Sequence, residues 1–279
     1  MERHIKLGDW NLLRIIRYSD YGLYLDGGRD GRILLPNRYV TPDMQRGQEI
    51  NAFIYLDQEE RPVATTETPL AKVGDFAYLE CVWVNEYGAF LDWGLMKNLF
   101  CPFHEQKMKM EIGKRYIVYI YIDEESYRIV ASAKVDKFIN HGTPEYEKGQ
   151  KVTGLVRQKT EVGFKVIVDN QWNGMVYDNE IYRHVTTGDH IDCYVKEVRF
   201  DGKIDLSLQP IGHQHTEEFA EVLLRYLEEH DGICQLGDKS DAEDIKNTFE
   251  VSKKAFKRAI GDLYKRRLIT VEPMCIKLI

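Results

Sequence analysis

A long hydrophobic run is missing from this sequence. No segment approaches the roughly 18 uninterrupted apolar residues that a membrane-spanning helix needs. The start, Met-Glu-Arg-His, has no apolar core like that of a secretory signal. Apolar residues make up 43% of the 279 residues and charged residues 30%, as in ordinary folded proteins. We therefore expect a folded, cytoplasmic protein with no membrane partner.

Cysteine is also scarce, and its pattern argues against two classes of protein. The five cysteines are odd in number, scattered and without a Cys-x-x-Cys pair. Neither a disulfide framework nor a zinc site of the usual spacing is therefore expected. Cys81, Cys101 and Cys193 lie inside apolar runs and are predicted to be small core residues.

Signatures of catalysis are absent too. The sequence contains no phosphate-binding Gly-x-x-x-x-Gly-Lys, no Gly-x-Ser-x-Gly and no His-Glu-x-x-His. The one close histidine pair, His213-x-His215, has no evident third ligand for a metal. Asp123-Glu124-Glu125 is typical of a solvated turn between strands. We predict no enzymatic activity, no cofactor and no metal.

The sequence also lacks an excess of positive charge. Lys and Arg number 38 against 45 Asp and Glu, which gives a net charge of −7. Net charge controls long-range steering rather than the local face that binds, so a polyanionic partner is not excluded. If the ligand is nucleic acid, we expect modest affinity and strong sensitivity to salt.

What the sequence does contain is one spacing pattern in three copies. The first four landmarks recur at steps of 66 and 75 residues, and the fifth at steps of 67 and 75. Five landmarks in one register indicate a tandem array of a single small unit. The landmarks are opening glycines (Gly8, Gly74, Gly149), second glycines (Gly22, Gly88, Gly163), apolar pairs with a following residue (Leu34-Leu35-Pro36, Phe100-Cys101-Pro102, Met175-Val176-Tyr177), third glycines (Gly47, Gly113, Gly188) and basic residues (Arg61, Arg128, Lys203).

Each copy is predicted to fold as a small β-barrel. Its segments are short, rich in β-branched and aromatic residues, and bounded by Gly, Asp or Asn. Five such strands with a longer connection between the third and fourth fit the Greek-key barrel of the OB-fold. No amphipathic stretch between successive strands supports a βαβ unit. In the second copy the strands are expected at 76–84, 89–93, 99–103, 116–122 and 127–133.

The C-terminal part changes to a helical period. From Thr216 apolar residues recur at three- and four-residue spacing, and Ser240-Asp241-Ala242-Glu243 predicts a capping box for a second helix. Ser252 is predicted to cap a third helix, and a strand-like tail follows. Three helices and a terminal hairpin are the order of a winged helix. We therefore predict a multidomain, mainly β protein, with OB-fold domains at 1–66, 70–136 and 146–211 and a winged helix at 216–279.

The segment after each second glycine is the expected ligand-binding strand of the barrel. It contains Tyr21-Gly22-Leu23-Tyr24 in the first copy and Tyr87-Gly88-Ala89-Phe90 in the second. Aromatic residues there can stack on unpaired bases. Packing at the edge of a small barrel is an equally simple interpretation for these rings, and both stay open.

This aromatic-Gly-x-aromatic pattern resembles the S1 RNA-binding domain. So do the apolar pair of the third strand and the closing Ile204-Asp205-Leu206-Ser207-Leu208-Gln209. Three such domains before a winged helix resemble the bacterial conserved virulence factor B family over nearly the whole chain. The resemblance implies an RNA-binding, regulatory protein without catalytic activity. It places the S1 stacking pair on Tyr21 and Tyr24, and on Tyr87 and Phe90.

The three copies differ from one another at this face. Many S1 domains have a His after the apolar pair of strand three, where this chain has Pro36, Pro102 and Tyr177. The third copy replaces the aromatic pair with Val162 and Lys165. We expect Lys165 to contact phosphate and Tyr177 to supply the one aromatic ring. The copies therefore look like parts of one composite surface.

The third helix of the winged helix is strongly basic. Between Lys253 and Arg267 lie seven basic residues and a single acid, Asp262. A basic face on a recognition-helix position suits a nucleic-acid backbone, although solvated charged faces are common on amphipathic helices. The residues expected to share the face opposite the apolar stripe are Lys254, Lys257, Arg258 and Lys265.

Together these patterns predict a protein that binds single-stranded RNA with low sequence specificity. The family resemblance adds a role in post-transcriptional regulation of gene expression. Two alternatives stay open. One is an interaction scaffold for a ribosomal or polymerase partner, and the other is a regulator that binds duplex DNA through the winged helix.

Overall fold

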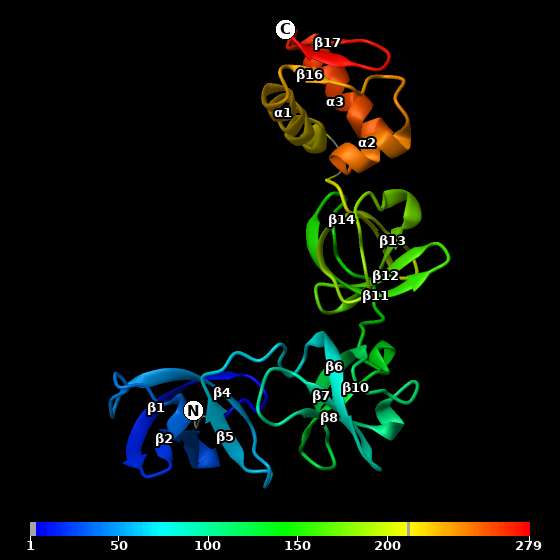
Figure 1. The fold of residues 1–279 in the computed structure, drawn as a ribbon. Coiled ribbons are helices and arrows are strands. Elements are labelled where there is room, and N and C mark those ends of the chain that lie inside the picture. The colour runs from blue at the N-terminus through cyan, green and yellow to red at the C-terminus, as the bar shows by residue number, and fades with distance from the viewer. Residues whose placement is uncertain (1–3, 211–212) are drawn as a thin grey trace. The chain divides into compact units, whose positions relative to one another are not determined.

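The computed structural model describes residues 4–210 and 213–279, in two compact units, Met1–Phe138 and Ile139–Ile279 (Figure 1). The first unit holds two closed five-stranded barrels. The strands of the first barrel are β1 (Trp10–Ser19), β2 (Gly22–Asp26), β3 (Arg32–Pro36), β4 (Glu49–Leu56) and β5 (Pro62–Thr65). Those of the second are β6 (Phe76–Val84), β7 (Gly88–Asp92), β8 (Leu99–Pro102), β9 (Arg115–Ile122) and β10 (Ile129–Ser132).

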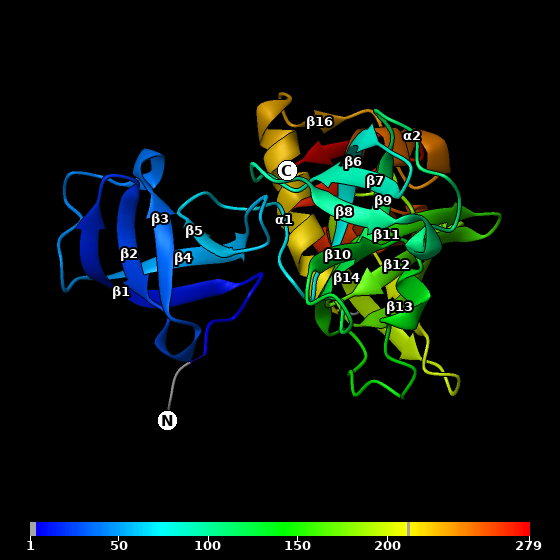
Figure 2. The same cartoon turned by 90° about the horizontal axis from the view of Figure 1, so that it is seen from below.

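The second unit holds a third closed barrel and a small helical domain. All three barrels close in the same order, in which the third strand pairs in parallel with the fifth. In Figure 2 β1, β2 and β3 of the first barrel lie side by side. The predicted mainly β, OB-fold architecture is confirmed. The strands of the third barrel are β11 (Lys151–Thr160), β12 (Gly163–Val168), β13 (Trp172–Tyr177), β14 (His190–Val198) and β15 (Ile204–Ser207).

The second glycine of each copy is required by close packing of two strands. A Cβ added at Gly22 or Gly163 would lie 2.0 or 2.1 Å from a carbonyl oxygen of the third strand. At Gly88 the same distance would be 2.4 Å. Real Cβ atoms do not approach backbone this closely, so the chain can start its second strand here only with glycine.

The third glycine of each copy marks the bulge in the first strand. Gly47, Gly113 and Gly188 all have positive φ, which glycine adopts without steric cost. The N–H of Gly113 donates to the Cys81 carbonyl at 2.8 Å, directly beside the bulge of β6. Equivalent bonds of 2.7 and 2.8 Å hold the bulges of β1 and β11. The spacing pattern therefore records contacts that each barrel must make.

The first two barrels share one hydrophobic cluster. Phe53 of the first barrel packs edge-on against Trp93 of the second, with ring centroids 5.9 Å apart. Trp10 packs against the same Phe53 at 5.7 Å. An ion pair of 3.0 Å between Lys72 Nζ and Asp9 Oδ1 ties the linker to the first barrel. A common apolar core makes these two barrels one body.

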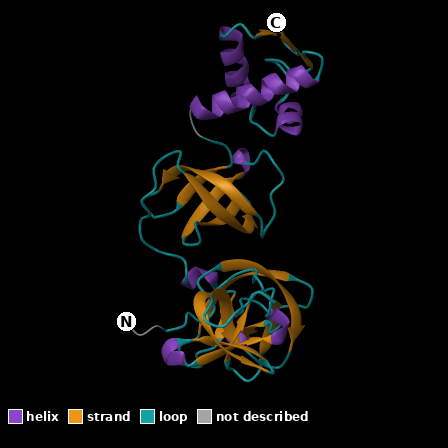
Figure 3. Ribbon diagram, turned by 90° about the vertical axis from the view of Figure 1, so that its left-hand side faces the viewer, coloured by secondary structure: helices purple, strands orange, loops and turns teal. Residues whose placement is uncertain are grey.

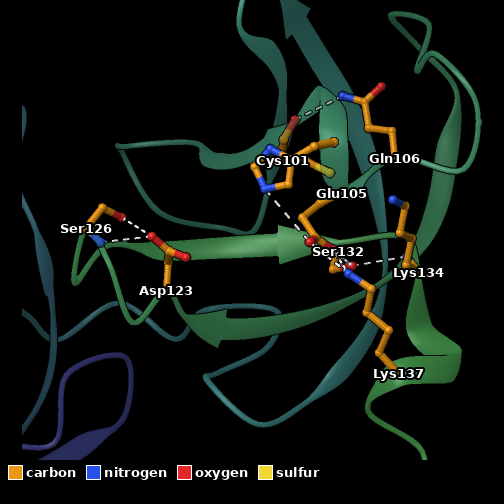
Figure 4. A network of polar contacts seen from close by, with 9 residues as sticks. Cys101, Glu105, Gln106, Asp123, Ser126, Ser132, Lys134 and Lys137 are labelled. Carbon is orange, nitrogen blue, oxygen red and sulfur yellow. Dashed lines mark hydrogen bonds and ion pairs between the residues drawn. The ribbon is translucent and has the colours of Figure 1, made fainter.

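A polar network of the second barrel surrounds a carboxylate just after the third strand, β8 (Figure 4). Glu105, only 6% exposed, ends the short helical turn Phe103–Glu105. It accepts hydrogen bonds from Ser132 Oγ and, at 2.9 Å, from Lys137 Nζ. Burial raises the pKa of Glu105, but the bonds from Ser132 and Lys137 outweigh it and leave the pKa below its usual value. In the third barrel Glu180 occupies the equivalent position, but it is partly exposed and pairs with Lys196 of β14 at 2.6 Å.

Three cysteines lie in the cores of the second and third barrels. Cys81, Cys101 and Cys193 are buried as free thiols, as predicted. Removal from water disfavours the thiolate and raises the pKa of Cys101 and Cys193 to about 12. These thiols are core residues.

The C-terminal domain has the order of a winged helix. Figure 3 shows its helices grouped with a small sheet, in contrast to the barrels. The prediction missed β16, which pairs with β18 and makes the sheet three-stranded. The elements are α1 (His213–Glu229), β16 (Ile233–Cys234), α2 (Ala242–Phe249), α3 (Lys253–Lys265), β17 (Ile269–Val271) and β18 (Ile276–Leu278).

Of the two predicted helix caps, one is confirmed and one was wrong. Ser252 Oγ accepts from Ala255 N at 3.0 Å and caps α3. The capping box does not form, because Asp241 is the N-cap of α2 and its side chain makes no cap bond. Ser240 lies one residue too early, buried in a turn, where its Oγ accepts from Gly237 N at 2.8 Å.

Two further expectations concern absent features. His213 is the first residue of α1 and does not lie in a linker before the winged helix. The side chains of residues 213–218 are outside the described part of the chain, so the expectation about the His213-x-His215 pair is not tested. Across residues 4–210 and 213–279, no helix has the length and apolar content to cross a membrane.

Candidate nucleic-acid interface

The first three strands of each barrel place three side chains in one row across the sheet. In the second barrel the strand register pairs Trp83 of β6 with Phe90 of β7, and Phe90 with Phe100 of β8. The ring centroids of Trp83 and Phe90 are 4.7 Å apart, and those of Phe90 and Phe100 are 5.1 Å apart. Trp83 is 52% exposed and both phenylalanines are partly exposed. The three rings form a continuous aromatic surface on the outside of the barrel, the aromatic row.

The β-bulge in β6 explains why the sequence analysis missed Trp83. The register shifts between Cys81 and Trp83, so Val82 and Trp83 both face outward after the buried Cys81. An alternating strand would have placed Trp83 inside. The detectable signal is a pair of successive large apolar residues that interrupts the alternation. The spacing pattern marks Phe100 only as part of the apolar pair of strand three.

The first barrel has one aromatic ring at the equivalent row. Arg17, Tyr24 and Leu34 pair across β1, β2 and β3. The Arg32 guanidinium lies 5.9 Å from the Tyr24 ring centroid, which places a cation beside the ring. Tyr21 is 74% exposed, in the turn before β2. The Tyr21–Tyr24 pair is thus accessible, and its role in binding stays a prediction.

The third barrel replaces the aromatic row with polar and flexible side chains. Gln158, Lys165 and Met175 pair across β11, β12 and β13, and Lys165 is exposed as expected for a phosphate contact. Tyr177 lies at the end of β13, where its hydroxyl accepts a hydrogen bond from the Arg199 side chain. The guanidinium carbon of Arg199 lies 5.8 Å from the centroid of the Tyr177 ring. Tyr177 therefore already has a stacking partner within its own barrel.

The remaining predicted aromatic residue, Tyr87, lies in the turn before β7. It is 66% exposed and reaches the rim of a groove that also contains Phe90 and Phe100. Tyr87 therefore lies next to the aromatic row. The predicted Tyr87–Phe90 pair belongs to the second barrel, which has the most aromatic outward row of the three barrels.

The basic residues predicted on α3 are all exposed, but they do not act as one free face. Lys257 Nζ pairs with Asp238 Oδ1 at 2.9 Å. Lys254 and Arg258 line a polar pocket of about 490 Å³ in the second unit. Lys265 lies in the last turn of α3. Within the described residues, no three His, Cys, Asp or Glu side chains converge as metal ligands.

Two family models match the chain. A model described as the CvfB-like winged helix domain matches residues 221–278, and one described as the S1 domain matches residues 7–67. Both describe binding domains rather than enzymes. Three S1-type barrels followed by a winged helix define a multidomain protein built from nucleic-acid-binding domains.

Relatives extend this likeness over nearly the whole chain. The uncharacterized protein YitL of Bacillus subtilis is 30% identical over 261 residues, which are 91% of this chain and 87% of that protein. Conserved virulence factor B of Staphylococcus aureus is 25% identical over 275 residues, or 95% and 92% of the two chains. The chain belongs to the conserved virulence factor B family. A solved multidomain protein with nucleic acid binding domains from Streptococcus pneumoniae is 24% identical, covers 98% of both chains and has a TM-score of 0.42.

Proposed function

We propose that this protein binds single-stranded RNA with low sequence specificity and acts in post-transcriptional regulation of gene expression. The observation that carries the proposal is the aromatic row Trp83–Phe90–Phe100. Solvent-accessible rings in contact, on the outer face of the first three strands, match the way OB-folds hold unpaired bases. Every base has a π-face, so stacking favours single strands without selecting a sequence.

The charge distribution supports the same ligand class. The overall charge of −7 gives little long-range attraction for a polyanion, so contacts must be local. Cations near the rings include Lys97 and Arg128 in the second barrel, and the exposed Lys165 is available in the third. A few phosphate contacts beside stacked bases give modest affinity that falls with salt.

The test is a titration of labelled oligouridylate, mixed-sequence RNA and duplex DNA at several salt concentrations. Wild type is compared with Tyr24→Ala/Phe90→Ala and with Lys254→Glu/Lys257→Glu. We expect RNA binding that weakens with salt and in both variants. Because stacking contributes about 1–3 kcal/mol per base, the aromatic variant should lose about fivefold or more.

Two results would overturn the proposal. Failure to bind any nucleic acid at low salt would favour a protein-interaction scaffold. A preference for duplex DNA that is lost only in the lysine variant would favour a DNA regulator acting through α3.

A further inference from the structure

A groove lies where the first and second barrels meet. Its volume is about 410 Å³, toward the lower end of the range for small-ligand sites. One wall comes from β4 and the β4–β5 turn of the first barrel, with Tyr55 and Gln58. The other comes from the second barrel, with Phe90 and Phe100. The two barrels share the Phe53–Trp93 cluster, so the groove lies within one compact unit.

The groove combines an aromatic wall with unpaired amides. Phe90 and Phe100, two rings of the aromatic row, line it directly. The side-chain amides of Gln58 and Asn98 also line it, and neither has a hydrogen-bond partner in the described part of the chain. Rings that stack and amides that both donate and accept are the groups that hold a nucleobase.

Two cations of the second barrel are held in this groove by one acid of the first. Glu60 Oε1 lies 3.1 Å from Lys97 Nζ and 3.4 Å from Arg128 Nε. Lys97 Nζ also donates to the Asp57 carbonyl at 2.7 Å. Glu60 occupies the β4–β5 turn with a φ of 60°, a conformation uncommon outside glycine and asparagine. A single carboxylate thus sits between two cations beside an aromatic wall.

We propose that this groove binds one unpaired nucleotide of an RNA strand, with its base against Phe90 and Phe100 and its phosphate in the place of the Glu60 carboxylate. Lys97 and Arg128 then contact the phosphate, which both cation types bind well. Glu60 competes with the phosphate and lowers the affinity. The inference rests on the proposed function and adds that the first barrel supplies part of the second barrel's site.

The chemistry of the groove favours a nucleotide over an acidic peptide. A carboxylate side chain could also displace Glu60 from the two cations. An acidic peptide, however, has no planar base to stack on the Phe90 and Phe100 rings. It would also leave the Gln58 and Asn98 amides without a base to bond to. A nucleotide uses the anion site, the aromatic wall and the amides together.

The first experiment compares two neighbouring acids in the full-length protein. Glu60→Gln removes the competing charge. Glu59→Gln is the matched control because, among the described residues, Glu59 pairs only with Arg61 of the same turn, at 2.7 Å. We expect Glu60→Gln to bind labelled oligouridylate about three- to tenfold tighter at low salt, and Glu59→Gln to stay within about twofold of wild type. Lys97→Gln and Arg128→Gln should each weaken binding.

A second readout does not depend on the stability of these variants. Oligouridylate carrying 4-thiouridine is crosslinked to the wild-type protein, and the modified peptides are identified. We expect crosslinks to residues 55–60 of the first barrel as well as to β7 and β8. Crosslinks limited to the second barrel would overturn the site.

The outcomes separate this site from the proposed function. If oligouridylate binds, Phe90→Ala weakens it, and Glu60→Gln behaves like Glu59→Gln, the groove proposal fails and RNA binding stands. If neither wild type nor Glu60→Gln binds RNA, both proposals fail. Oligoglutamate that binds as tightly as oligouridylate would also overturn the nucleotide assignment.

Discussion

The second and third barrels close in the same strand order but differ completely at the equivalent surface row. The second barrel has Trp83–Phe90–Phe100, and the third has Gln158–Lys165–Met175. The fold is preserved because the second and third glycines keep their contacts. The outward row makes no such contacts and is free to change. The difference teaches that in this chain barrel architecture and the chemistry of the outward surface are specified by separate sets of residues.

Removing the aromatic row is expected to have the largest effect. In Trp83→Ala/Phe90→Ala the stacking surface of the second barrel is lost, and oligouridylate binding should fall at least tenfold, since about 1–3 kcal/mol is associated with each stacked base. Equilibrium titration measures the change. Gln158→Ala/Lys165→Ala, the same positions in the third barrel, is the matched control. Equal losses in the two variants would contradict the division between the barrels.

Introducing the aromatic residues into the third barrel should raise the affinity for oligouridylate, by less than their removal from the second barrel lowers it. Lys165→Phe/Met175→Phe places two of the three aromatic residues of the second barrel at the same register of the third. We expect binding of oligouridylate to strengthen about fivefold, with a shallower salt dependence because one cation is lost. Lys165→Leu/Met175→Leu is the apolar control without rings. A gain of the same size in that control would show that stacking is not responsible.

Loss of the third barrel's lysine alone should change salt dependence more than affinity. If Lys165 contacts one phosphate, Lys165→Gln should reduce the slope of log K against log salt by about 0.7, the value for one contact on a single strand. Titrations at four salt concentrations measure this slope. An unchanged slope would remove Lys165 from the interface.

The buried carboxylate Glu105 should give the smallest effect, visible only in acid. The pKa of Glu105 is lowered in the folded protein, so its contribution to stability is present above the unfolded pKa, about 4.3, and is lost as pH falls through the folded pKa. Thermal unfolding between about pH 6 and 3 should therefore show an acid loss of stability that Glu105→Gln lacks. Glu111→Gln, at an exposed pair with Lys114, is the control. An identical acid profile for Glu105→Gln and wild type would contradict this assignment.

Much of the fold could be predicted because it is marked by short patterns in the sequence. Gly22, Gly88 and Gly163 mark strand starts where no Cβ fits, and Ser252 caps α3 with its own side chain. The capping box at Ser240 failed because a turn bond to Gly237 took its hydroxyl. Two-residue strands such as β16 have no periodic signal and form only by pairing with β18.

The candidate site was less predictable than the barrels. Tyr24, Phe90 and Lys165 were found because they follow the second glycine by two residues in each copy. Trp83 was missed because the β-bulge in β6 turns its side chain from the inside of the barrel to the outside. The contact of Tyr177 with Arg199 was missed because the two residues are 22 positions apart in the sequence. Whether these residues bind RNA remains a prediction.

By itself the sequence determined the tandem barrels, the winged helix and the aromatic character of the second strand's face. Glycine spacing and strand alternation recur along the chain at fixed intervals, so they are visible without knowledge of the partners that the glycines contact. Only the tertiary structure decided that Trp83 joins Phe90 and Phe100 and that Glu60 of one barrel neutralises Lys97 and Arg128 of the next. These contacts depend on a β-bulge and on the packing of two barrels, which bring together side chains that no local pattern connects.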